Sequence, residues 1–193
     1  GIIQDIGSIK FIKQGLYEVQ TNLNLSTCKE GSSISCNGVC LTAKNIIQKD
    51  HKLFTFEVNI GEETLKRTNL SNSISKKEKI NLEKSLQLGD EISGHFVYGH
   101  IDDTTILSEI LELENSWEYH FEKKFNKNNK FIVEKGSISI NGISLTVAKV
   151  ENNTFMISVI DHTFHHTNLK FLKKSDQVNI EFDYLARFIL NNE

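Results

Sequence analysis

The chain has 193 residues, of which 38% are hydrophobic and 24% charged, as expected for a globular protein with a packed core. A net charge of −3 argues against a nucleic-acid-binding protein, which usually carries a basic stripe. No apolar run reaches the length of a membrane-spanning helix and no secretory signal is visible, so we predict a cytoplasmic protein that binds neither membrane nor nucleic acid. Three cysteines, an odd number, do not indicate a disulfide framework.

The first strong signal along the chain is a hairpin around Asn37-Gly38. Apolar and polar residues alternate over 33–36 and 39–42 on either side of this pair. Asn-Gly tolerates positive φ at both turn positions, which suits a tight two-residue turn. Further strands are expected at 53–58, 117–121, 154–160 and 177–182.

The same hairpin returns in the second half of the chain. Residues 36–42 (CNGVCLT) return as 140–146 (INGISLT). Two further pairs of segments match in the same order: 63–70 with 162–169, and 81–83 with 179–181. The period is too long for a solenoid or a propeller blade, so it indicates a duplicated domain. Two copies of one binding surface would suit a protein that handles two copies of one ligand.

Many short strands at even spacing predict two small β-barrels in tandem. Helical signals are few: residues 123–134 form either a short helix or a loop, and 183–190 begin a helix with apolar residues three and four apart. We place an N-terminal barrel at 1–95, a C-terminal barrel at 96–185 and a helical tail at 186–193. The chain starts with Gly1 rather than Met, so we expect residues to be missing from its front.

Two histidines at the domain junction are the first candidates for chemistry. His95 and His100 are five residues apart, next to Gly94 and Gly99. They could transfer protons near neutral pH, bind a metal, or have a structural role, and the spacing leaves all three open. No zinc motif, P-loop, dinucleotide-binding glycine motif or nucleophile elbow accompanies them.

Small polar residues recur at equivalent positions of the two units. Cys40 and Thr42 share one face of their strand, and Ser144 and Thr146 take the same places in the repeat. Thr64 and Thr163 recur as well, either as ligand-facing hydroxyls or as caps of strand ends. His165 and His166 have basic residues as counterparts at 66 and 67, so we interpret them as surface residues rather than metal ligands.

Taken in order along the chain, these segments resemble the riboflavin synthase family. Besides the repeated segments, the resemblance rests on Gly1-Ile2-Ile3, the segments 94–97 and 99–102, and Lys135-Gly136-Ser137-Ile138. It covers nearly the whole chain. Two departures are the absence of the family's opening Met-Phe-Thr before Gly1 and the short segment after Phe182.

The resemblance implies an all-β fold of two tandem, homologous six-stranded Greek-key barrels with short helices and a short C-terminal helix. It implies that two molecules of 6,7-dimethyl-8-ribityllumazine exchange a four-carbon unit, giving riboflavin and 5-amino-6-(ribitylamino)pyrimidinedione, without cofactor or metal. This is the last step of riboflavin biosynthesis. A homotrimer with active sites between subunits is expected, and association with lumazine synthase is left open. The alternative is a non-catalytic, antenna-type relative that binds lumazine or flavin.

The resemblance also implies site residues. The expected chemical group is Ser33, Cys40, His95, His100 and Lys135, whose presence favours the enzyme over the antenna-type relative. Asn141 stands where some relatives have an Asp thought to assist catalysis, so its catalytic part is in doubt. The expected substrate-binding residues are Gly1, Ile2, Ile3, Cys40, Leu41, Thr42, Asn59, Ile60, Gly61, Glu62, Glu63, Thr64, Gly99, His100, Ile101, Lys135, Ser144, Leu145, Thr146, Ser158, Val159, Ile160, Asp161, His162 and Thr163.

Overall fold

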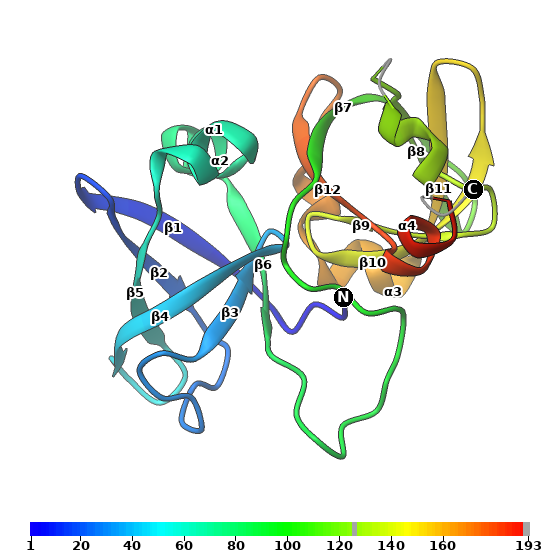
Figure 1. The fold of residues 1–193 in the computed structure, drawn as a ribbon. Coiled ribbons are helices and arrows are strands. Elements are labelled where there is room, and N and C mark those ends of the chain that lie inside the picture. The colour runs from blue at the N-terminus through cyan, green and yellow to red at the C-terminus, as the bar shows by residue number, and fades with distance from the viewer. Residues whose placement is uncertain (125–126, 191–193) are drawn as a thin grey trace.

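The computed structural model describes residues 1–124 and 127–190, and it contains two closed antiparallel β-barrels of six strands each (Figure 1). In the first barrel the strands follow the order β1-β2-β5-β4-β3-β6 around the closed sheet. Their bounds are β1 Asp5–Lys13, β2 Leu16–Thr21, β3 Ser33–Cys36, β4 Val39–Gln48, β5 Phe54–Asn59 and β6 Lys79–Lys84, with helices α1 (Glu62–Arg67) and α2 (Leu70–Lys76) between β5 and β6.

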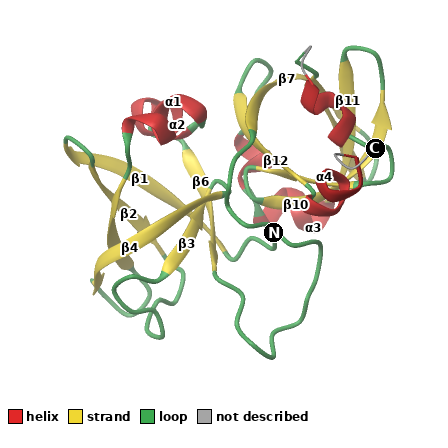
Figure 2. Cartoon of the chain, in the orientation of Figure 1, coloured by secondary structure: helices red, strands yellow, loops and turns green. Residues whose placement is uncertain are grey.

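The second barrel repeats this order, as β7-β8-β11-β10-β9-β12, so the duplication is confirmed at the level of topology. Its strands are β7 Asp103–Glu112, β8 Ser116–Glu122, β9 Ser137–Ile140, β10 Ile143–Val150, β11 Thr154–Ile160 and β12 Gln177–Phe182. The short helices are η1 (Lys127–Phe131), α3 (Asp161–His166), η2 (Asn168–Phe171) and α4 (Tyr184–Leu190) (Figure 2). The predicted fold class is therefore confirmed.

Several expected elements can be compared directly. The strands expected at 154–160 and 177–182 match β11 and β12, and the expected terminal helix is α4. The segment 123–134 contains the single short 3₁₀-helix η1, and residues 125–126 of that segment lie outside the described part of the chain. The predicted boundary at 95/96 falls in the connection between β6 and β7, and the domain bounds stay a prediction.

Each barrel has its own hydrophobic core, because alternate residues of every strand point inward. Val19, Phe56 and Ile80 are fully buried in the first barrel, and Phe121 and Phe155 are fully buried in the second. Burying a side chain of this size contributes about 1.5–3 kcal/mol. Within the described residues, none of the helices is long and apolar enough to cross a membrane.

The barrels meet through their Asn-Gly turns. Gly38 (φ +80°) and Gly142 (φ +82°) approach so closely that a Cβ on Gly38 would lie 2.7 Å from Gly142 N. A Cβ on Gly142 would likewise lie 2.8 Å from Gly38 N. The two positions therefore need glycine both for their left-handed backbone and for the contact between the barrels.

Six buried asparagines surround this contact, and we call them the asparagine network. Asn69 N donates to Asn179 Oδ1 at 2.6 Å, and in the equivalent bond Asn168 N donates to Asn81 Oδ1 at 2.7 Å. The reciprocity means that the barrels are related by an approximate twofold axis. Since each hydrogen bond contributes about 0.5–1.5 kcal/mol, the network helps to fix the angle between the barrels. Its members are Asn37, Asn69, Asn81, Asn141, Asn168 and Asn179.

Candidate functional site

In each barrel, the second strand of the Asn-Gly hairpin binds a short segment from the beginning of the other unit. Cys40 N on β4 donates to Gly99 O at 2.9 Å, and Ser144 N on β10 donates to Gly1 O at 2.8 Å. The approach is close, since a Cβ on Gly99 would lie 2.6 Å from Cys40 Cβ, and one on Gly1 would lie 2.7 Å from Ser144 Cβ. The start of the second unit thus lies against β4 of the first barrel, and the start of the first unit lies against β10 of the second.

This exchange brings the predicted binding residues of the first barrel together. Strand β4 pairs with β5 at Ala43 and Val58, so residues 40–42 lie beside the end of β5 and the start of α1. We call the set of residues 40–42, 59–64 and 99–101 the N-barrel cradle. These are residues that the family resemblance implies, and their contacts with a ligand stay a prediction.

The second barrel has an equivalent site. Val147 on β10 pairs with Ile157 on β11, which places residues 144–146 beside 158–163. With residues 1–3 these form the C-barrel cradle. As predicted from the alternation, Cys40 and Thr42 share the outward face of β4, while the residues on either side of each are buried. Both cradles therefore present a strand edge, with its backbone N–H and C=O groups, beside small polar side chains.

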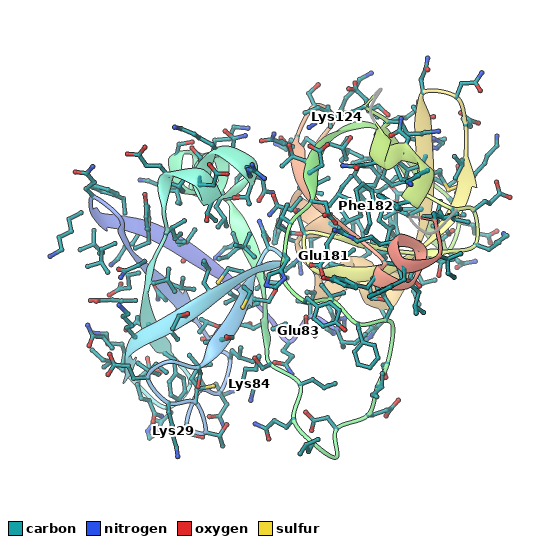
Figure 3. All side chains as sticks on the ribbon, in the orientation of Figure 1. Lys29, Glu83, Lys84, Lys124, Glu181 and Phe182 are labelled. Atoms are coloured by element: carbon teal, nitrogen blue, oxygen red, sulfur yellow. The ribbon has the colours of Figure 1, made fainter. Side chains whose placement is uncertain are left out.

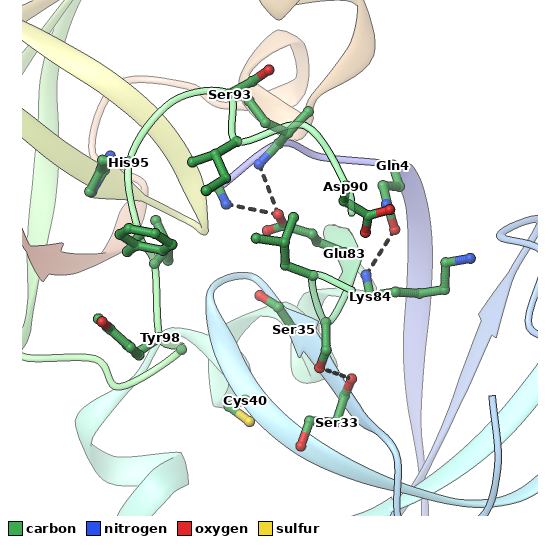
Figure 4. A pocket seen from close by; sticks show the side chains of 18 of the residues that line it. Gln4, Ser33, Ser35, Cys40, Glu83, Lys84, Asp90, Ser93, His95 and Tyr98 are labelled. Carbon is green, nitrogen blue, oxygen red and sulfur yellow. Dashed lines mark hydrogen bonds and ion pairs between the residues drawn. The ribbon is translucent and has the colours of Figure 1, made fainter. Parts of the chain in front are cut away.

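A cavity of about 400 Å³ lies between the first barrel and the connection from β6 to β7 (Figure 4). Three of the predicted chemical residues, Ser33, Cys40 and His95, line it. Gly1 and Gly99 line it as well, so the cavity reaches a segment of each cradle. The structure therefore brings three of the five residues of the predicted chemical group to one place.

His95 contacts Ser144, the C-barrel counterpart of Cys40. Its Nδ1 lies 2.6 Å from Ser144 Oγ, and its backbone N donates to the same oxygen at 3.1 Å. Burial lowers the pKa of His95 below its ordinary value, against a smaller opposing effect of the Asp183 carboxylate. A neutral imidazole beside a hydroxyl can accept a proton from it or through it. The prediction named both residues, but sequence spacing gave no sign that they touch.

The other predicted chemical residues do not line this cavity. His100 is an exposed member of the N-barrel cradle. Lys135 is exposed two residues before β9, and its backbone N donates to Val147 O at 2.8 Å, so it adjoins the C-barrel cradle. Asn141 is fully buried in the asparagine network, where its Oδ1 accepts from Asn69 and Asn179. This geometry supports a structural role for Asn141, and its catalytic part stays a prediction.

Two functional candidates were missed in the sequence. Glu83 and Glu181 occupy equivalent positions on β6 and β12, and each accepts hydrogen bonds from the backbone of an exchanged segment. The repeated Asn-Leu-Glu and Asn-Ile-Glu at 81–83 and 179–181 were the available signal. Among the described residues, no group of three or more His, Cys, Asp or Glu side chains is arranged to hold a metal ion.

Comparison with known proteins shows the family of the chain. The family model of the lumazine binding domain matches residues 1–85 and 98–183. Riboflavin synthase of Brucella abortus (strain 2308) is 40% identical over 194 residues, covering 97% of this chain and 94% of the relative. Riboflavin synthase of Bacillus subtilis (strain 168) is 33% identical, covering 98% of this chain and 86% of the relative.

A solved structure shares the same architecture. The crystal structure of LumP complexed with riboflavin has a TM-score of 0.75 to this chain at 21% identity, covering 94% of this chain and 97% of that one. This likeness concerns the fold of the two barrels. The identity to the curated relatives extends over nearly the full length, and the family model matches both barrels. The chain therefore belongs to the riboflavin synthase family of proteins with tandem lumazine-binding domains.

Proposed function

We propose that the chain forms riboflavin by dismutation of two molecules of 6,7-dimethyl-8-ribityllumazine, with 5-amino-6-(ribitylamino)pyrimidinedione as the second product. The observation that carries this proposal is the pair of equivalent cradles, each completed by a segment of the other unit. A reaction between two identical molecules needs two similar binding sites. A four-carbon unit leaves one lumazine and joins the other, so the reaction needs no external cofactor.

The cradles suit a flat heteroaromatic ligand. Each offers a strand edge whose backbone N–H and C=O groups can bind a pyrimidine edge independently of side-chain identity. We assign one lumazine to the N-barrel cradle and one to the C-barrel cradle, with all the substrate-binding residues named above.

The reaction begins with removal of a proton from one lumazine. The 7-methyl group of the lumazine is acidic because its carbanion delocalises into the ring. His95, held neutral by burial and in contact with Ser144, is the base that we assign to this proton at the C-barrel cradle. His100 is exposed in the N-barrel cradle and is the second proton carrier.

The second lumazine must be activated for attack. Cys40 and Ser33 line the cavity and either add to the ring or orient a water molecule that does. Lys135 adjoins the C-barrel cradle, where its ammonium group stabilises negative charge that develops on the ring of the lumazine bound there.

Assembly follows from the family resemblance. We propose a homotrimer in which the N-barrel cradle of one subunit faces the C-barrel cradle of the next. Helix α4 supports this, because Leu185, Phe188 and Ile189 are each more than 60% exposed in the single chain. Sedimentation or light scattering would measure the subunit number. A cytoplasmic location is supported by the three free cysteines, and association with lumazine synthase is tested by co-purification.

One incubation tests the proposed activity. The purified chain is given the lumazine alone, and riboflavin is followed by absorbance and chromatography. We expect riboflavin at half the lumazine consumed, and loss of product in Cys40→Ala. Tight binding without product would contradict the enzyme and favour the antenna-type alternative.

A further inference from the structure

Glu181, on β12 of the second barrel, is a buried carboxylate that binds the backbone of a distant segment. Only 3% of the residue is exposed. Its Oε1 accepts a hydrogen bond from Tyr98 N at 2.6 Å, and its Oε2 accepts from Gly99 N at 2.9 Å and from His100 N at 3.1 Å. Three successive amides thus converge on one side chain. Charge-assisted bonds of this kind are stronger than neutral ones, so they fix the direction of the segment.

The segment that Glu181 holds completes the cradle of the other barrel. Gly99 O accepts from Cys40 N, so the segment turns its amides toward the second barrel and this carbonyl toward the first. The position of His100 beside the N-barrel cradle is therefore set from both sides. Among the hydrogen bonds of the described residues, four tie residues 98–100 to a barrel. If the three to Glu181 were lost, the bond from Cys40 N to Gly99 O would remain.

Opposing effects act on the charge of this carboxylate. Burial raises the pKa of Glu181, although three backbone N–H groups lower it, and the Asp102 carboxylate raises it further. An acid with a raised folded-state pKa contributes most to stability below its unfolded pKa and loses that contribution as pH rises through the folded value. Burial thus disfavours the ionised form, and the three N–H groups of residues 98–100 are the groups that favour it.

The same arrangement occurs in the other half of the chain. Glu83 on β6 accepts from Gly1 N at 2.8 Å and from Ile2 N at 3.0 Å, and Gly1 O accepts from Ser144 N. Both carboxylates come from the last strand of a barrel, and both lie at the junction of the barrels (Figure 3). The last strand of each barrel thus supports the segment that completes the cradle of the other barrel.

We infer that Glu181 is a positioning residue of the N-barrel cradle, and that Glu83 has the same role for the C-barrel cradle. By holding residues 98–100, Glu181 places His100 and the Gly99 peptide against the ring of a lumazine or flavin bound at residues 40–42. This inference rests on the proposed function, because it takes the cradles to be ligand sites. It adds that each site depends on a side chain of the other barrel.

The test is Glu181→Gln in the full chain, titrated with riboflavin. Glutamine keeps the shape but turns an NH₂ group toward at least one of the three amides, so a hydrogen bond is replaced by a donor–donor contact. Flavin fluorescence counts both sites. Trp117, the only tryptophan, pairs with Val159 on β11 and reports the C-barrel cradle alone. We expect the affinity of the N-barrel cradle for riboflavin to fall by about tenfold or more in Glu181→Gln.

The Trp117-reported affinity and the melting temperature of Glu181→Gln should stay close to those of the wild type. Glu83→Ala is the reciprocal variant and should weaken the Trp117-reported site instead. Unchanged affinity at both sites in Glu181→Gln would overturn the inference. Loss of both sites with a lower melting temperature would also overturn it, because Glu181 would then act through the stability of the fold.

Binding is the readout, so the two proposals fail separately. A wild-type chain that binds riboflavin at two sites but forms none from lumazine refutes the proposed function, and the effect of Glu181→Gln on binding still decides the inference. A wild-type chain that binds riboflavin at neither cradle refutes both.

Discussion

Replacing Gly38 by alanine should destabilise the chain by pushing the two barrels apart where they are closest. The added Cβ would lie 2.7 Å from Gly142 N and 3.0 Å from Gly142 Cα. Both atoms belong to the backbone of the other barrel, so no side-chain rotation can relieve the contact. The clash also falls beside the asparagine network, whose hydrogen bonds require the barrels at their present separation.

Two costs add at this position. Alanine at φ +80° costs about 1–2 kcal/mol, because an L-residue in the left-handed region brings Cβ against the backbone. Overpacking at a close contact costs a further 1–3 kcal/mol or so. Gly15 provides a matched control, since it has φ +73° with no atom within 4 Å of the added Cβ. Gly15→Ala carries the first cost alone, so the difference between the variants measures the contact between barrels.

Urea unfolding, followed by Trp117 fluorescence and circular dichroism, gives the free energy of unfolding of each variant. Gly38→Ala should fall below Gly15→Ala by about 1–3 kcal/mol. Gly142→Ala should match Gly38→Ala, because its Cβ would lie 2.8 Å from Gly38 N. Equal free energies for Gly38→Ala and Gly15→Ala would refute the reasoning, since the barrels would then not depend on this contact.

Three further predictions concern the cavity and the thiols. The rate of riboflavin formation should decline as pH falls, with a midpoint below the ordinary His pKa of 6.5. The reason is that the neutral ring of His95 is needed and burial lowers its pKa. A pH–rate profile checks this. Ser144→Ala should lower the rate by about tenfold or more in single turnovers, since the hydroxyl beside the ring is lost. A thiol reagent should modify exposed Cys40 first, Cys28 more slowly and buried Cys36 only on unfolding, as peptide mapping would show.

The strands that the sequence predicts well are those with one buried face. On β11 and β12 the apolar residues alternate or run continuously between clear turn residues, so their ends are predicted without error. The Asn-Gly hairpins are equally clear, because positive φ at Asn37 and Asn141 selects this pair.

The strands β1 and β7 were missed for physical reasons. The second half of β1 is exposed on both faces, so Phe11 and Ile12 break the alternation. On β7 a register shift between Leu107 and Glu109 interrupts the period of two, and the apolar residues then fall at helix-like spacings. Neither pattern indicates a strand until the neighbouring strands are known.

The recurring segments have two uses. They predict a duplicated ligand surface, and the cradles are consistent with that. The recurring asparagines at 37, 69 and 81, with their counterparts, instead form the network between the barrels. A residue that recurs in two domains can serve the contact between them as well as a common ligand, and only the long-range hydrogen bonds separate these uses.

A dismutation also needs two identical molecules to react differently, so two identical cradles would not suffice. The equivalent positions Cys40 and Ser144 supply a difference. Ser144 Oγ contacts a half-buried imidazole whose pKa is lowered, whereas Cys40 is an exposed thiol on the wall of the cavity. The first environment suits removal of a proton and the second suits addition to a ring. The duplication thus supplies two similar binding sites, and the residues that differ between its halves supply the two roles.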